Sequence, residues 1–354
     1  MRELIHALAD QPDWSGVLRF VLLFIPIWWV WIGHTLYNDR FETDDVSHKL
    51  LTFLMMLPIA GLAIFARDGL DSTAFGFGVS YILARLVLIF LWIRGGYHNP
   101  EIRKTTGIYS IGFSTSVILW TISLFVPAPL QLILRGLGLA IDLFTPALTF
   151  GEQSKLPRFS NSHLPERFGL LVIIVLGETI IATAEKIADL PVMTTHSLLI
   201  GGLGMLLAFG LWWLYFNTIP VRRVRQNEWV KAAWGYGHLP LHIGTGAIGA
   251  AMLAIIANGA NLLRSEIIWL LCGGAAITLL FNGLLELTLV PDQHDVEHKK
   301  SDRGIRFGGA LLIILVGTFA PRLGATFFLL ALSLLMLGQV IHGIVHRYDD
   351  PECE

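Results

Sequence analysis

Several ionisable side chains lie inside long apolar stretches of this sequence: Glu178, Arg85, Asp142 and Arg135. Ionisable side chains are costly in lipid, so those that occur in spanning helices usually face a protein interior and often mark proton or substrate pathways. At about 1.5 Å per residue from Arg167, Glu178 lies roughly 16 Å along its helix, close to the centre of a bilayer. We predict that Glu178 carries a proton or a substrate charge, with a structural ion pair as the alternative.

Arg85 cannot shed its charge and therefore needs a carboxylate or a bound anion. Glu178 and Asp142 are the natural partners. Arg135 and Asp142 are seven residues apart and fall on one face of a helix. A permanent pair at Arg85 would hold the helices together, whereas a pair that breaks during a cycle would act as a gate, and the sequence leaves both readings open.

Aromatic and polar side chains at similar depth predict a cavity. Trp28 is about 18 Å from Arg40 by helical rise, too deep for the interfacial belt that tryptophan usually occupies. A deep indole N–H needs a polar partner, which a wet interior supplies. Plain packing and interhelical hydrogen bonds are the alternatives. The predicted lining is Trp28, Trp31, His34, Trp212, Asn217, His238 and Asn282.

His238 and His242 are four residues apart, but Pro240 lies between them and no third ligand is nearby, so we expect a helix kink rather than a metal site. The loop "NDRFETDD" (residues 38–45) predicts a cation-attracting cytoplasmic vestibule. Ion pairs with Arg222, Arg223 and Arg225, or a helix cap by Asp44 or Asp45, are alternatives. The predicted vestibule residues are Asp39, Arg40, Asp44, Asp45 and Arg167.

The composition is that of a polytopic membrane protein. The 354 residues are 54% hydrophobic and 15% charged, with a mean hydropathy of +0.63, far more apolar than a soluble domain. The first 14 residues are polar and mixed in charge, unlike a cleavable signal peptide. A net charge of −2 gives no reason to expect nucleic acid as a partner. Two cysteines in different settings predict neither a disulfide nor a metal site, and no cofactor is expected.

Segments of about 20 apolar residues are long enough to cross a bilayer as helices. The sequence predicts an all-α transmembrane bundle of about eleven spans, at residues 17–37, 47–66, 74–94, 107–126, 130–149, 166–186, 196–217, 234–257, 266–290, 305–320 and 323–344. Lys and Arg collect on one side of this arrangement, as they do in cytoplasmic loops. We therefore predict a bacterial cytoplasmic membrane protein with an external N-terminus and a cytoplasmic C-terminus.

Two short matches predict an internal duplication. The Trp-Trp pair at residues 28–29 recurs at residues 212–213, and "ALADQP" (Ala7–Pro12) is echoed by "KIADLP" (Lys186–Pro191). Chance similarity of apolar helices is the alternative. With an even number of spans in each complete repeat the halves are parallel. The predicted division, in which the first repeat has five spans and the second six, is 1–150, a cytoplasmic linker 151–165, 166–346 and a tail 347–354.

Two motifs carry a resemblance to a known family. "WWVWIGHTLYNDRFETDDVSHKLL" (Trp28–Leu51), followed by "LPERFGLLVIIVLGETIIATA" (Leu164–Ala184), resembles the bacterial low-temperature-requirement A (LtrA) membrane proteins. The resemblance covers essentially the whole chain and implies a polytopic architecture with a role in growth in the cold. Members usually begin with a helix carrying a Glu-Leu-Phe-Phe-Asp-Leu type pattern, and this sequence starts roughly where that helix would end.

These features favour a secondary transporter, coupled to protons or ions, of an unidentified small or amphipathic substrate. Glu178 would carry the coupling charge and Arg85 would be its counter-ion. One alternative is an intramembrane enzyme, which is less favoured because no set of nucleophile, base and orienting group is evident. Another is a non-catalytic membrane factor or channel that supports growth at low temperature. No Gly-x-x-x-x-Gly-Lys loop for direct ATP drive occurs.

Overall fold

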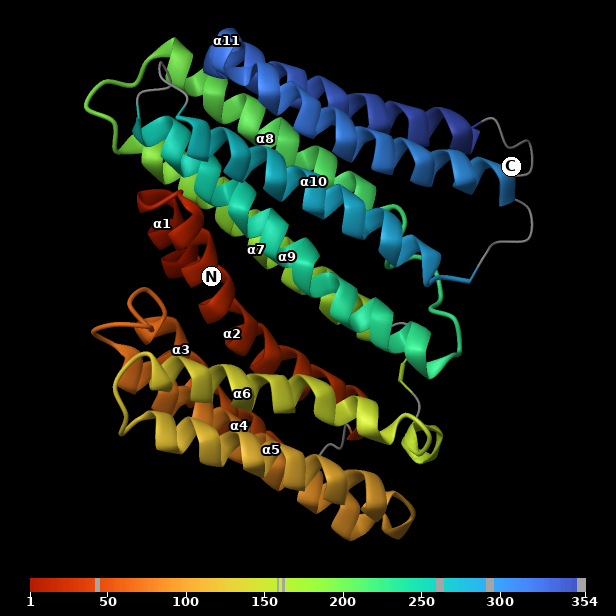
Figure 1. The fold of residues 1–354 in the computed structure, drawn as a ribbon. Coiled ribbons are helices and arrows are strands. Elements are labelled where there is room, and N and C mark those ends of the chain that lie inside the picture. Colours follow the sequence, from red (N-terminus) through yellow and green to blue (C-terminus); the bar gives the residue numbers. More distant parts are fainter. Residues whose placement is uncertain (42–44, 158, 161–162, 259–263, 291–295, 349–354) are drawn as a thin grey trace. The chain divides into compact units, whose positions relative to one another are not determined.

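The computed structural model describes residues 1–41, 45–157, 159–160, 163–258, 264–290 and 296–348. Over these residues the chain forms helices and no strand, apart from an isolated bridge between Val224 and Leu289, which confirms the all-α prediction. The helices are α1 (Arg2–Asp10), α2 (Trp14–Phe41), α3 (Val46–Phe65), α4 (Ala74–His98), α5 (Arg103–Ser123), α6 (Leu130–Phe144), α7 (His163–Ala188), α8 (Thr195–Phe216), α9 (Glu228–Ala257), α10 (Ser265–Leu287) and α11 (Val296–Tyr348) (Figure 1).

The chain divides into two compact units. The small unit is Leu22–Leu164, and the large unit combines Met1–Val21 with Pro165–Glu354. Helix α2 begins in the large unit and continues into the small one. Within the small unit α3 packs on α4, α4 on α5 and α5 on α6, and within the large unit α10 packs on both α9 and α11 while α11 packs on α8. The predicted repeat and its boundaries stay a prediction.

Nine helices in the described part of the chain are long and apolar enough to cross a membrane, so this is a multi-pass membrane protein. They are α2, α3, α4, α6 with the 3-10 turn that follows it, α7, α8, α9, α10 and α11. Two differences separate this set from the eleven predicted spans. Helix α5, predicted to span at 107–126, is absent from the set, and the last two predicted spans are joined in α11.

Helix α5 is less apolar because it carries many hydroxyl side chains. Ser110, Thr115 and Thr121 each donate a hydrogen bond to the backbone carbonyl four residues earlier, at 2.8–2.9 Å. Such bonds satisfy the hydroxyl within its own helix. The polar atoms of α5 therefore cost less in an apolar environment than the hydropathy of its residues implies.

Helix α11 consists of two antiparallel halves. The stretch Arg303–Val345 has 43 residues, about 65 Å as one straight helix and about twice the thickness of the hydrocarbon core. The helix breaks at Gly324, whose φ of 70° is in the left-handed region. A Cβ built at Gly309 would lie 2.5 Å from Nε2 of Gln339, so the two halves lie side by side (Figure 1). They match the predicted segments 305–320 and 323–344.

Helix α1 is a finding that the polar composition of the first residues did not predict. Its Leu4, Ile5 and Leu8 are buried, and the helix packs against α9. Arg2 at its start pairs with Glu185 of α7, with 2.6 Å between Nη2 and Oε2. The spacing of the three apolar residues gives α1 one buried face.

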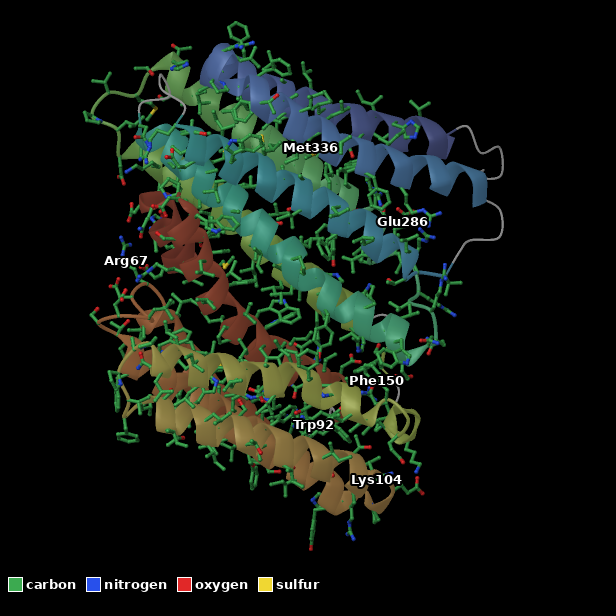
Figure 2. The ribbon with its side chains drawn as sticks, viewed as in Figure 1. Arg67, Trp92, Lys104, Phe150, Glu286 and Met336 are labelled. Carbon is green, nitrogen blue, oxygen red and sulfur yellow. The ribbon has the colours of Figure 1, made fainter. Side chains whose placement is uncertain are left out.

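Aromatic rings join the helices of the small unit near one end of α4. Trp92 (Figure 2) meets the rings of Tyr37, Phe41 and Tyr109 edge-on, with centroids 4.7–5.6 Å apart. Edge-to-face contacts of this kind contribute beyond the area that they bury. The cluster connects α2, α4 and α5 and so fixes the rotation of α4 about its axis.

The turn in α11 gives a stability prediction. We expect Gly324→Ala to lower the free energy of unfolding by about 1–2 kcal/mol, because a Cβ is strained at positive φ. Gly338→Ala is the matched control, since Gly338 is helical, lies in the same element and would place its Cβ in open space. It should be neutral or stabilising by up to about 1 kcal/mol. Unfolding in mixed detergent micelles measures both, and equal effects would contradict the assigned turn.

Candidate functional site

The small unit contains a fully buried ion pair between α4 and α6. Nη2 of Arg85 donates to Oδ1 of Asp142 at 2.6 Å, and both side chains are at most 1% exposed. Oδ2 of Asp142 accepts from the Tyr81 hydroxyl at 2.5 Å and from the Ser116 hydroxyl, on α5, at 2.9 Å. The carboxylate therefore has hydrogen bonds on both oxygens.

The sequence positions these groups through helical spacing. Tyr81 and Arg85 are four residues apart on α4, so they project from one face toward Asp142. On α5, Phe113 lies three residues before Ser116, and its ring lies 4.2 Å from Cζ of Arg85. The ring attracts the cation from one side, while Ser116 holds the carboxylate. Helices α4 and α5 thus supply the contacts described here to the carboxylate on α6.

The pair lies deep in the bundle. Arg85 is about 17 Å from the start of α4 and about 20 Å from its end, by helical rise. Nε and Nη1 of Arg85 are buried, and neither has a hydrogen-bond partner in the described part of the chain. Of the two predicted partners, Asp142 is therefore the one that pairs with Arg85. The guanidinium retains donors that this carboxylate does not use.

Arg135 does not join this pair, although it shares α6 with Asp142. Its nitrogens donate to the carbonyl oxygens of Gly69, at 3.3 Å, and Ala74, at 2.7 Å, and to the Ser123 hydroxyl at 3.3 Å. These bonds tie α6 to the turn between α3 and α4. The seven-residue spacing predicted that Arg135 and Asp142 lie on one face of α6. Arg135 nevertheless bonds other groups than Asp142, and these contacts favour a structural role.

Glu178 lies on α7 in the large unit and is partly buried. Its Oε1 is buried without a hydrogen-bond partner among the described residues. The carboxylate interacts electrostatically with the amino group of Met1. No hydrogen bond or salt bridge of the kind that satisfies Asp142 holds it in the described structure. The structural ion pair that was the alternative for Glu178 stays a prediction, with the amino group of Met1 as the opposite charge.

The predicted cavity residues on α2 and α8 have different surroundings. Trp28 is fully buried, and its indole nitrogen has no hydrogen-bond partner among the described residues. Trp31 is partly buried, with its ring 6.4 Å from that of Trp28, and His34 bonds Asn38 on the next turn, at 3.0 Å. Trp212, in contrast, is 38% exposed and stacks on Phe216 along the α8 surface.

The remaining predicted lining residues lie in the large unit. Nδ1 of His238 is 2.7 Å from the Trp234 carbonyl, which can only accept, so Nδ1 carries the proton and Nε2 accepts from the Tyr215 hydroxyl at 3.0 Å. Asn282 is buried on α10, and Asn217 lies at the C-terminal cap of α8. The described residues include no group of three metal-ligating side chains.

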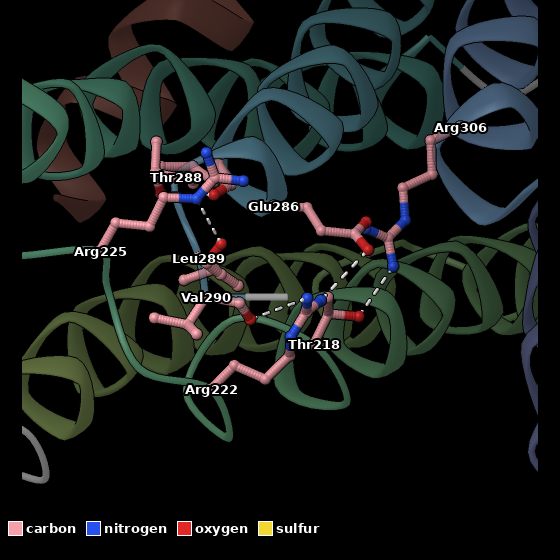
Figure 3. A network of polar contacts seen from close by, with 9 residues as sticks. Thr218, Arg222, Arg225, Glu286, Thr288, Leu289, Val290 and Arg306 are labelled. Atoms are coloured by element: carbon pink, nitrogen blue, oxygen red, sulfur yellow. Dashed lines mark hydrogen bonds and ion pairs between the residues drawn. The ribbon is translucent and has the colours of Figure 1, made fainter. Parts of the chain in front are cut away.

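A polar network that the sequence analysis did not identify joins α8, α10 and α11 at one end of the large unit (Figure 3). Glu286 is 4% exposed and pairs with Arg306 of α11 through Oε2 and with Arg222 through Oε1, at 3.3 Å. Arg306 also donates to the Thr218 hydroxyl at 2.8 Å. The basic run at residues 222–225 and the acid near the end of α10 are the sequence signals for this network.

The same network fixes two chain segments. Arg222 and Arg225 donate to the carbonyls of Val290 and Leu289, at 3.3 and 2.9 Å. Two backbone bonds also join these segments, from the Arg225 amide to the Thr288 carbonyl at 3.0 Å and from the Val290 amide to the Arg223 carbonyl at 2.8 Å. The connection after α8 and the end of α10 are thereby held together. Arg222 is thus engaged by Glu286 and by the Val290 carbonyl.

The predicted vestibule residues of the small unit contact other segments of that unit. Asp39 accepts from the Ser160 amide at 2.8 Å, and Arg40 donates to the Pro157 carbonyl at 2.8 Å. Asp45 caps α3 by accepting from the His48 amide at 2.6 Å, which confirms the alternative of a helix cap, and it pairs with Arg94 of α4 at 2.8 Å. Asp44 lies outside the described residues, and Arg167 is on α7 of the large unit.

Near the same end of α5, Glu152 bridges Lys104 and Lys155, at 2.7 and 2.6 Å. Hydrogen bonds from the two ammonium groups, and then their charges, lower the pKa of Glu152 to about 2. The stabilisation that this carboxylate supplies is present above its usual pKa and is lost as the pH falls toward 2. These exposed charges are screened by salt and contribute little.

The Glu286 network gives a second stability prediction. Glu286→Gln removes the carboxylate that two guanidinium groups share while their charges stay buried, so we expect a loss of about 3 kcal/mol in the free energy of unfolding. Glu266→Gln is the control on the same helix, because Glu266 is 44% exposed and should matter by less than about 0.5 kcal/mol. Unfolding in mixed micelles compares them, and equal stabilities would contradict the importance of the network.

Comparisons with known proteins identify the family. A family model described as bacterial low temperature requirement A protein (LtrA) matches residues 2–341. An uncharacterized protein of Rhizobium meliloti (strain 1021) is 24% identical over 281 residues, which cover 68% of this chain and 62% of that relative. The chain thus spans less than two thirds of the relative's length. No solved structure matches the chain. Because the family model covers nearly all of its residues, the protein belongs to the bacterial low temperature requirement A family.

Proposed function

We propose that this LtrA-family protein is a secondary transporter of an unidentified small or amphipathic substrate, coupled to protons or another ion. The observation that carries the proposal is the carboxylate of Glu178, in the middle part of an apolar helix, with a buried oxygen that makes no hydrogen bond among the described residues. A carboxylate in a spanning helix that accepts no hydrogen bond on a buried oxygen is costly, which favours a group that takes up a proton or changes partner during a cycle.

The architecture supports this proposal. Multiple spanning helices suit alternating access, in which a transporter exposes its binding site first to one side of the membrane and then to the other. The predicted parallel repeat, with halves at 1–150 and 166–346, is part of the proposal. So is the placement in the bacterial cytoplasmic membrane with the N-terminus outside, which is supported by the predicted distribution of Lys and Arg.

The polar groups of the two units would then have different roles. Glu178 would take up and release the coupling proton, and Arg85 would provide a permanent positive charge. The contacts at the ends of the units, Glu286 with Arg306 and Asp45 with Arg94, lie on the predicted cytoplasmic side and would close it in this state. Opening toward the cytoplasm would require these pairs to exchange their partners for water or substrate.

We expect Glu178→Gln to abolish proton-coupled uptake, because glutamine cannot take up or release the proton. Purified protein is reconstituted in liposomes that contain a pH-sensitive dye, and a panel of amino acids, organic acids and quaternary amines is added under a pH gradient. Substrate-dependent acidification should fall at least about tenfold, the effect of losing an essential proton-transfer group. A melting temperature close to that of wild type would show that the variant remains folded.

Glu185→Gln is the matched control, because Glu185 is on the same helix but 43% exposed and paired with Arg2. Its uptake should equal that of wild type. Wild-type behaviour of Glu178→Gln would remove the proton role from this residue. Chemical turnover of a panel compound by detergent-solubilised protein, without any gradient, would favour the intramembrane enzyme instead.

A further inference from the structure

The guanidinium of Arg85 is fully buried, yet only part of its hydrogen-bonding capacity is used. Nη2 meets Asp142, whereas Nε and Nη1 have no partner in the described part of the chain. The Phe113 ring lies over one face at 4.2 Å. A guanidinium binds carboxylates in its own plane, often through two parallel N–H···O bonds. The unused donors are thus directed along the edges that recognise a carboxylate.

The two oxygens of Asp142 have different partners. Its carboxylate is held on one side by Arg85, through Oδ1, and on the other by the Tyr81 and Ser116 hydroxyls, through Oδ2. Among the described residues Oδ1 accepts from Arg85 alone. Arg85 can therefore leave Oδ1 while both hydroxyls continue to hold Oδ2. Asp142 thus keeps its hydrogen bonds from Tyr81 and Ser116 when the bond from Arg85 is broken.

Gly33 of helix α2 lies beside Nη1 of Arg85 and has no side chain. A Cβ built at Gly33 would lie 3.4 Å from Nη1 of Arg85 and 2.8 Å from Cδ2 of Leu88. The approach to Leu88 is closer than real Cβ atoms show, so a larger residue at position 33 would push against Leu88 and fill the space beside Nη1. Glycine at this position allows α2 to approach α4 closely and places no side chain of its own against Nη1.

We propose that Arg85 binds the carboxylate of a monoanionic organic substrate, and that Asp142 is the counter-ion that occupies Arg85 when the substrate is absent. This inference rests on the proposed transport function and names the substrate class for it. Protonation of Asp142 on Oδ1 releases Arg85, and the substrate carboxylate takes its place. When the substrate carboxylate leaves, Asp142 gives up its proton to the aqueous phase that receives the substrate, and Arg85 returns to Oδ1.

The charge balance selects a monoanion. With Asp142 ionised, Arg85 and Asp142 sum to zero. With Asp142 protonated and one carboxylate bound, the sum is again zero, so the site on Arg85 takes up one proton at Asp142 for each anion that it binds. A dianion would leave a buried negative charge, which is costly at this depth. In the described part of the chain, two charged or titratable groups face Asp142, and both are on α4: Arg85 and Tyr81. Helix α5 contributes the uncharged Ser116. Arg135, on the same helix as Asp142, bonds the turn between α3 and α4 instead.

Asp142→Asn tests the inference, because asparagine imitates the protonated acid. Sodium acetate is the probe, with chloride and sulfate at equal ionic strength for comparison. Acetate should raise the melting temperature of the purified, full-length variant saturably, by about 2 °C or more, as a ligand of the folded state does. Chloride and sulfate should not. Wild-type protein should respond to acetate only as the pH falls and Asp142 takes up its proton.

The double variant Arg85→Gln/Asp142→Asn is the matched control, since it lacks both charges and should not respond to acetate. An Asp142→Asn protein that ignores acetate, or a double variant that responds equally, would overturn the inference. If Asp142→Asn does not fold, the wild-type titration decides: acetate stabilisation that grows on acidification supports the proposal, and its absence at every pH overturns it. Because no gradient is used, failure here is distinct from failure of the Glu178 proposal.

Discussion

Lipid cannot solvate charge, and this constraint governs the small unit of the protein. Arg85 keeps its positive charge at any relevant pH, and it lies near the middle of a helix that is apolar enough to span. The chain must therefore bring a carboxylate to it, together with enough donors to satisfy that carboxylate. Asp142, Tyr81, Ser116 and the ring of Phe113 meet this need, and they do so only if α4, α5 and α6 have the relative rotation seen here.

A buried pair of this kind is weak evidence for stability, since desolvation offsets much of the attraction. Removing one partner is costly, but replacing both with apolar residues is often tolerated. The unused donors of Arg85 are therefore the observation on which we base its proposed role in binding. Arg135 provides the contrast, because each of its nitrogens donates to a carbonyl or hydroxyl of the protein.

The large unit handles charge differently. Glu286 is shared by two arginines at the end of the helices, where the chain also forms backbone bonds between two connections. Such a network fixes the ends of α8, α10 and α11 together. Glu178, deeper in the same unit, has no comparable set of donors among the described residues. Asp142 and Glu286 thus have hydrogen bonds or ion pairs on both carboxylate oxygens. Glu178 has a buried oxygen without a hydrogen bond among the described residues, as expected where a group changes its protonation or its partner during function.

Much of the architecture followed from composition and periodicity, because a bilayer leaves the backbone few options other than helix. Helix positions, the multi-pass character, the family and the list of deep ionisable residues were all accessible from the sequence.

The partner of Arg85 was not accessible from the sequence, since Glu178 and Asp142 were both plausible and the choice depends on which helices pack and how each is rotated. The i, i+7 spacing of Arg135 and Asp142 was real, but one α6 face meets two different surroundings along its length. The contacts of Glu286, the buried face of α1 and the exposed position of Trp212 likewise required the tertiary structure, because hydropathy gives the length of a spanning helix and not the direction in which its side chains point.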